Sequence, residues 1–219
     1  MAFWPASAAA LVALQEALGV ATEPPWQGHG DTAVAGCFVC FPRGIAGRGA
    51  AGDPAWAAAA CGEEVVVHAG RAAAPYEPGM LALREGALLE AAVRALVASP
   101  DVLLVNATGR DHPRRAGLAL HLGAVLGLPS IGVTHRPLYA AGERPTDRRG
   151  ATAPLLLAGE EVGRWVVTRR GRRPLAVTPG WRTGIETAVE VVLACAGAAR
   201  TPEPLRAARR AARLARAAG

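Results

Sequence analysis

Lysine is absent from this chain, and all 24 of its basic residues are arginines. No reaction step in this protein can therefore use a lysine ammonium. Together with the abundance of alanine and glycine, the exclusive use of arginine is typical of proteins encoded by GC-rich genomes. The formal charge of +6 suits a polyanionic partner, but this coding bias weakens any argument from arginine content alone.

Long apolar runs are also missing, because Arg, Glu, Gly or Pro interrupts each one before it reaches the length of a membrane span. The apolar N-terminal stretch lacks a basic leading region and contains Gln15 and Glu16, which favours a short amphipathic helix over a signal peptide. We therefore expect a cytoplasmic protein without a membrane segment. Its 219 residues fit a single domain, 1–219, in which 200–219 form a basic helical tail.

Cysteine is scarce, with four residues in all. Cys37 and Cys40 have the spacing of a metal knuckle or redox pair, but they lie in a predicted strand, where residues three apart face opposite sides. No second pair completes a zinc site. We therefore predict buried free thiols in a reducing compartment.

A glycine-rich stretch, residues 47–52 (GRGAAG), matches the pattern of a dinucleotide-binding loop. The match begins too far after the preceding strand, and the segment that follows is too short for a crossover helix. A flexible hairpin loop is therefore the favoured interpretation.

The apolar pattern predicts three consecutive strands and then an alternation of helices and strands. Three consecutive antiparallel strands form a meander, which predicts an α/β protein with a mixed sheet: the meander plus parallel strands, flanked by helices in the manner of ribonuclease H-like folds. The expected strands are 33–41, 55–60, 63–69, 102–105, 129–133 and a hairpin of 165–168 with 175–178, and the expected helices are 5–18, 79–98, 113–127, 182–196 and a tail helix through Arg216.

The stretch from Asp101 to Gly117 is the expected functional centre. An apolar strand, Val102 to Val105, ends at Asn106, and a turn leads to a charged cluster that is predicted to open the next helix. Groups at the carboxyl end of a buried strand and at the following helix N-terminus face the ligand crevice in α/β sheets.

Four segments in the right order resemble the endonuclease V family, which comprises metal-dependent nucleases that nick near deaminated purines, chiefly inosine. The resemblance covers roughly residues 5 to 215 and implies a ribonuclease H-like fold. VNATGRDHPRRAG at 105–117 resembles the family pattern V-D-G-x-G-x-x-H-P-R-x-x-G, and PYEPGMLALRE at 75–85 resembles P-Y-x-P-G-x-L-x-x-R-E. LPSIGV at 128–133 and TPEPLR at 201–206 are similar to the strand before the family's lysine and to its closing P-E-P-x-R.

The departures from the family pattern fall on its active-site positions. Of the three metal carboxylates that the resemblance implies, only the helix glutamate is retained, as Glu85; the other two positions hold Phe38 and Asn106. The family's lysine falls on His135, and a late histidine of the family falls on Trp181.

The family uses Mg²⁺ as its cofactor, and Mg²⁺ is anchored chiefly by carboxylates. Glu85 alone is expected to bind the ion weakly at best, Asn106 offers a single neutral carbonyl, and a mostly neutral His135 replaces lysine poorly. Asp31 and Asp111 are nearby carboxylates but are not favoured as replacement ligands, since Asp111 lies past the strand end. We therefore predict very low or absent metal-dependent nicking.

The residues expected to bind nucleic acid are better preserved. The resemblance assigns Tyr76 the role of a wedge inserted at the lesion. Without the motif, Tyr76 would be interpreted as an ordinary aromatic residue of a loop. Guanidinium groups and backbone N–H groups on the opening turn of a helix also suit phosphate, although a solvated turn is an equal alternative on local sequence. The candidate set is Pro75, Tyr76, Glu77, Pro78, Gly109, His112, Arg114 and Arg115.

Three hypotheses follow. The first is an endonuclease V-like protein that binds DNA or RNA with distorted or inosine-containing bases and has lost most catalysis. The second is an active nuclease with a site rebuilt around Glu85, Asn106 and His135. The third is a pseudo-enzyme that serves as a protein-interaction scaffold. In each case the chain is expected to be a monomer.

Overall fold

The computed structural model describes residues 2–28, 30–44 and 48–219, so Gly47 of the glycine-rich stretch lies outside the described residues. An eight-stranded mixed sheet forms the centre, with the strand order β3-β2-β1-β4-β5-β8-β7-β6. The strands are β1 (Val34–Cys40), β2 (Pro54–Cys61), β3 (Glu64–Arg71), β4 (Val102–Val105), β5 (Ser130–Thr134), β6 (Thr152–Leu157), β7 (Glu160–Val166) and β8 (Leu175–Pro179).

Strands β1, β2 and β3 form the predicted antiparallel meander, and β4 and β5 continue the sheet parallel to β1. The hairpin of β7 and β8 is confirmed, but β6, which pairs with β7 at the sheet edge, was missed. Pro154 lies within β6, and a proline is tolerated there because an edge strand leaves one row of N–H groups unpaired. The antiparallel pairing of β1 with β2 confirms that a hairpin loop joins them.

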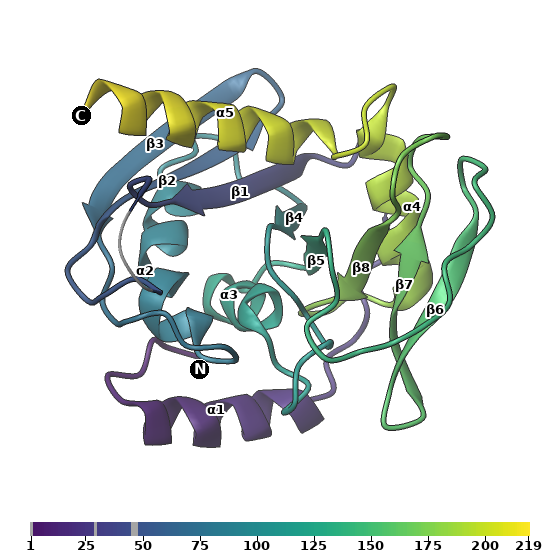
Figure 1. Ribbon diagram of the computed structural model, residues 1–219, viewed down its shortest axis with the longest axis horizontal. Coiled ribbons are helices and arrows are strands. Elements are labelled where there is room, and N and C mark those ends of the chain that lie inside the picture. The colour runs from purple at the N-terminus through teal and green to yellow at the C-terminus, as the bar shows by residue number, and fades with distance from the viewer. Residues whose placement is uncertain (1, 29, 45–47) are drawn as a thin grey trace.

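Helices cover both faces of the sheet (Figure 1). They are α1 (Ala8–Val20), α2 (Leu81–Arg94), α3 (Leu118–Leu126), α4 (Ile185–Ala196) and α5 (Glu203–Ala218). Helices α2 and α3 bury one core against β1, β2 and β4, and α1 packs outside them. Helices α4 and α5 close the other face. In the part of the chain that the structure describes, no helix is long and apolar enough to cross a membrane.

Cys37 and Cys40 are both buried, and they belong to different cores on opposite faces of β1, as their spacing predicts. The four cysteines carry free thiols, of which these two are buried and the others partly buried. Strand β2 contains a run of alanines that alternate between the same two cores. Small side chains there let α2 and α5 approach the sheet closely, so tertiary packing decides the strand that alanine propensity leaves ambiguous.

Candidate functional site

Three of the positions that depart from the family's active-site pattern lie toward the carboxyl ends of neighbouring parallel strands. β1 and β4 pair in a register that sets Cys37 beside Val105, which places Phe38 and Asn106 next to each other. His135 directly follows β5, which pairs with β4. The parallel sheet therefore brings Phe38, Asn106 and His135 to one edge, as expected for a ligand crevice.

A fourth side chain reaches this edge from α5. The Nη2 of Arg209 donates a hydrogen bond of 2.8 Å to the Oδ1 of Asn106. Its guanidinium carbon lies 5.1 Å from the centre of the Phe38 ring, and that of Arg213 lies 5.9 Å from the same ring. An aromatic face and an amide oxygen thus hold a permanent cation between the ends of β1 and β4.

Divalent metal does not fit this arrangement. Phe38 has no ligating atom, and the one amide oxygen of Asn106 already accepts from Arg209. Across residues 2–28, 30–44 and 48–219 there is no group of three His, Cys, Asp or Glu side chains placed to hold an ion. Mg²⁺ requires several oxygen ligands, carboxylates among them, and a guanidinium beside the one available oxygen repels it.

Glu85, the retained carboxylate, projects from α2 on the other face of β1. It lines a pocket of about 370 Å³ together with Phe41, Arg84 and Tyr76. Burial raises the pKa of Glu85 to about 7, while the charge on Arg84 acts in the opposite direction. Tyr76 also lines the pocket that contains Asn106, so it connects the surroundings of Glu85 and Asn106.

The expected wedge, Tyr76, lies on the surface of the molecule. Its side chain is 40% exposed, and the flanking residues from Pro75 to Pro78 are exposed as well. The buried guanidinium of Arg84 holds the tetrapeptide in place, because it donates to the carbonyl oxygens of Ala50 and Ala74 and pairs with Asp53. An aromatic ring presented on a fixed backbone is suited to stacking on a base.

A second pocket, of about 180 Å³, opens beside Tyr76. Its walls include Asn106, His112 and Leu138 as well as the turn at Gly79. It is narrow and mainly apolar with a few polar groups, which suits a flat ligand such as a single base.

His112 and Arg114 stabilise the wall of this pocket through the turn at Gly79. The Nε2 of His112 and the Nε2 of Gln15 each lie 3.1 Å from the carbonyl oxygen of Gly79, and the Nε of Arg114 donates to Gln15. The backbone N–H of Arg114 donates to the Nδ1 of His112, so this ring carries its proton on Nε2. Burial lowers the pKa of His112 to about 4, which keeps it neutral.

The prediction that Asp111 to Arg115 open a helix is wrong. Helix α3 begins at Leu118, and the preceding residues form a turned loop in which Arg115 has a positive φ of 56°. A left-handed residue cannot belong to a right-handed helix, so the argument from a helix N-terminus does not apply to these residues. Arg115 pairs with Glu160, and Gly109 is buried against the backbone of Pro179.

Trp181 and the two spare carboxylates lie outside the cluster of Phe38, Asn106 and His135. Trp181 follows β8, which runs antiparallel to β5, and its backbone bonds to Ser130 at the opposite end of that strand. Both oxygens of Asp111 accept backbone N–H groups from residues 138–140, and Asp31 precedes the start of β1. The structure therefore separates Trp181 from the other substituted positions and assigns Asp111 to holding a loop.

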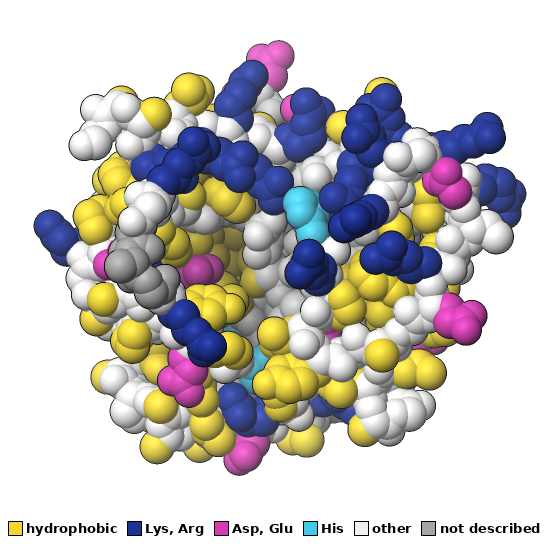
Figure 2. Space-filling view, in the orientation of Figure 1, with side chains coloured by type: hydrophobic (Ala, Val, Ile, Leu, Met, Phe, Trp, Pro, Cys, Tyr) yellow, Lys and Arg dark blue, Asp and Glu magenta, His cyan; other side chains and the backbone are white. Residues whose placement is uncertain are grey.

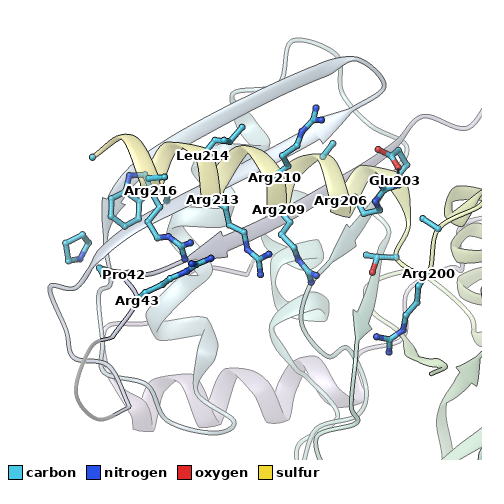
Figure 3. Close-up of a pocket in the computed structure, with 17 residues that line it drawn as sticks. Pro42, Arg43, Arg200, Glu203, Arg206, Arg209, Arg210, Arg213, Leu214 and Arg216 are labelled. Carbon is cyan, nitrogen blue, oxygen red and sulfur yellow. Dashed lines mark hydrogen bonds and ion pairs between the residues drawn. The ribbon is translucent and has the colours of Figure 1, made fainter. Parts of the chain in front are cut away.

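A groove of about 1070 Å³ runs along α5 beside this edge of the sheet. Arg209, Arg213 and Arg216 point into it from one side of the helix, and Arg43 meets them from the β1–β2 loop (Figure 3). Arg200 lies toward its other end (Figure 3). Figure 2 shows the basic side chains gathered along the α5 side of this face, above a hollow.

Arg209 belongs to the basic tail that the sequence predicts, but the sequence patterns did not place it beside Phe38 and Asn106. It falls three residues beyond Arg206, the last residue of the recognised TPEPLR segment, and it shares a helix face with Arg213 and Arg216. The spacing of 209, 213 and 216 is the signal that could have grouped the three. No local pattern, however, predicts which strand end the face of a helix distant in sequence will meet.

Comparisons with known proteins agree with the motifs. A family model described as Endonuclease V matches residues 28–210. The endonuclease V of Streptomyces coelicolor is 39% identical over 207 residues, which cover 93% of this chain and 88% of that protein. The crystal structure of the Streptomyces avermitilis endonuclease V matches with a TM-score of 0.83 and 35% identity, over 97% of this chain and 94% of that one.

A more distant likeness is to a Ciona intestinalis endonuclease V in complex with a DNA that contains an inosine. That structure has a TM-score of 0.78 and 21% identity, and the match covers 96% of this chain and 97% of that one. At this identity the likeness concerns the fold alone. Together the structural likenesses confirm the predicted ribonuclease H-like fold.

Proposed function

Because the chain belongs to the endonuclease V family, we propose that it binds DNA or RNA at distorted or inosine-containing sites and that its metal-dependent cleavage is weak or lost. The observation that carries the proposal is the hydrogen bond from Arg209 to Asn106, which places a protein cation where the family pattern requires a carboxylate to face a metal ion. Phe38 does not supply the negative charge of the family's carboxylate, and a neutral His135 does not supply the positive charge of its lysine. Burial lowers the pKa of His135, and the charges of Arg200 and Arg209 lower it further.

Recognition is proposed to use Tyr76 and the pocket beside it. Tyr76 stacks at the distorted step, and the unpaired base enters the pocket lined by Asn106 and His112, since a base must leave the duplex before a protein can surround it. His112 and Arg114 act on binding indirectly, because their contacts hold the turn at Gly79. The arginines of the α5 groove bind the phosphate backbone.

The first test measures the affinity for labelled oligonucleotides with and without one inosine, by fluorescence anisotropy. Tyr76→Ala is expected to lower the affinity for the inosine strand by roughly five- to a hundredfold, which corresponds to the loss of about 1–3 kcal/mol of stacking. Tyr139→Ala is the matched control, because Tyr139 is the other tyrosine of the chain and is 53% exposed. Equal losses in the two variants would contradict the proposed role of Tyr76.

A nicking assay with Mg²⁺ or Mn²⁺ separates this proposal from its alternatives. We expect no product, or very little, under conditions in which the protein binds the same strand. Cleavage that Glu85→Ala abolishes would instead show an active nuclease with a rebuilt site. If the protein binds neither DNA nor RNA, the remaining hypothesis is a pseudo-enzyme that serves as a protein-interaction scaffold.

A further inference from the structure

The arginines around the ends of β1 and β4 carry positive charge that no carboxylate of the described residues neutralises in an ion pair. The ion pairs of the described residues engage other arginines, whereas Arg43, Arg200, Arg209 and Arg213 have no carboxylate partner in that part of the chain. Burial, followed by the charges of Arg213 and Arg200, lowers the pKa of Arg209. Like charges held this close raise the free energy of the molecule until an anion binds among them.

Arg209 also has an unused donor. Its Nε is buried and finds no hydrogen-bond acceptor among the described residues, while its Nη2 is engaged by Asn106. A buried donor without a partner is uncommon and costly, so an oxygen that reaches it gains a charge-assisted hydrogen bond. Uncompensated charge and an unpaired donor are independent observations, and both indicate an oxyanion.

We propose that Arg209 takes the place of the divalent cation at the ends of β1 and β4, so that the site binds a backbone phosphate of nucleic acid without any metal ion. Arg213, on the same side of α5, and Arg200 complete the phosphate site. That the anion is a phosphate of nucleic acid rests on the proposed function. The position of Arg209 in place of the cation rests only on its contacts with Asn106 and Phe38. A guanidinium can offer two parallel N–H groups to a phosphate, and unlike Mg²⁺ it needs no carboxylate to hold it.

The placement of Arg209 has a direct consequence for restoring the metal site. In the double variant Phe38→Asp/Asn106→Asp the two new carboxylates face the guanidinium of Arg209 and pair with it. This pairing neutralises part of the negative charge that would otherwise attract a metal ion. The triple variant, which adds Arg209→Ala, leaves the two new carboxylates unpaired, so that a cation from solution can bind them.

Isothermal titration calorimetry with Mn²⁺ on the purified proteins tests whether Arg209 occupies the cation position. We expect no binding by the wild type and at least a roughly tenfold higher affinity in the triple than in the double variant. A double variant that binds Mn²⁺ as tightly as the triple variant would overturn the proposal. Circular dichroism of each variant controls for folding, and if the triple variant is unfolded, the oligonucleotide measurement below decides.

The second measurement compares oligonucleotide affinity in EDTA and in Mg²⁺ at constant ionic strength. The wild type is expected to bind equally in both, and Arg209→Gln, which keeps a donor for Asn106, to bind about tenfold more weakly or worse. Arg94→Gln removes the same charge from the end of α2, outside the groove, and is expected to lose less than about threefold.

Affinity that requires Mg²⁺, or equal losses in the Arg209 and Arg94 variants, would refute the metal-free phosphate site. A wild-type protein that binds no oligonucleotide would refute the proposed function instead. In that case the Mn²⁺ titration still decides whether Arg209 occupies the cation position.

Discussion

At the scale of single residues, the edge formed by β1 and β4 has changed the sign of its charge. Phe38 and Asn106 are neutral where the family resemblance places carboxylates, and Arg209 contacts both of them. A site of this kind repels a metal ion and attracts a phosphate. Phe38, Asn106 and Arg209 therefore depend on one another, because each carboxylate restored alone would meet the guanidinium rather than a cation from solution.

A second residue-scale prediction concerns His112. Burial lowers its pKa from 6.5 to about 4, so between these values the unfolded chain binds more protons than the folded protein. The contribution of His112 to stability is therefore complete above about pH 6.5 and is lost as the pH falls toward about 4. In His112→Gln, whose amide can still donate to Gly79, the free energy of unfolding should depend less on pH across this interval.

Denaturant unfolding at a series of pH values checks this prediction. Glu85 contributes with the opposite sign, since its raised pKa favours the folded protein at lower pH, but it is present in both proteins and drops out of their difference. An identical pH dependence in the wild type and the variant would contradict the prediction.

At the scale of elements, the position of Arg209 depends on how closely α5 packs on β1 and β2. The helix buries Leu205, Ala208 and Ala212, and its two alanines pack against Cys40, Ala58 and Ala60 of the strands. A Cβ added at Gly36 would lie 2.5 Å from the backbone of Pro204 and Leu205 at the start of α5. Glycine is required there because backbone cannot move aside as a flexible side chain can.

Gly36→Ala should therefore displace the start of α5 and lower the free energy of unfolding by about 1–3 kcal/mol. Oligonucleotide affinity should fall too, although no arginine is removed. Gly30→Ala is the control, since a Cβ there meets nothing within 4 Å. Chemical denaturation measures the stability of both variants, and a loss of similar size in Gly30→Ala would show that the helix contact is not responsible.

At the scale of the whole molecule, the formal charge of +6 is unevenly distributed. The α5 groove is lined by seven arginines, and among the described residues only Arg206 of these forms an ion pair, with Glu203. A concentrated patch attracts a polyanion more strongly than the same charge spread over the surface. The groove thus supports nucleic acid as the partner better than arginine content alone does.

The affinity for oligonucleotides should accordingly fall steeply with salt. If about five phosphates are neutralised, the logarithm of the affinity falls by about 3–5 units for each tenfold rise in salt. Anisotropy titrations at several salt concentrations measure this slope. A slope near zero would favour the scaffold, whereas a slope reduced by about one in Arg213→Gln would place that residue on the phosphate backbone.

Size-exclusion chromatography tests the expected monomer. The single domain, the monomeric state and the cytoplasmic location stay predictions.

The fold class, the meander, most helices and the family could be predicted from the amino-acid sequence, because they follow from apolar periodicity and from motifs contiguous in the chain. The sequence also located the losses at Phe38 and Asn106. The local structure from Asp111 to Arg115 was predicted wrongly, since the bonds that bend this loop come from Glu160 and Gly79, which are distant in sequence. Contacts of that kind leave no periodic signal in the loop itself.

The group at the position of the missing metal site depends on tertiary packing. Arg209 lies 103 residues beyond Asn106 in the chain, and its side chain reaches the strand end because α5 packs across the sheet through small residues. The sequence shows two carboxylates lost. The packing of α5 shows a guanidinium in contact with both positions, because the approach of a helix to a strand depends on the shapes of both surfaces together.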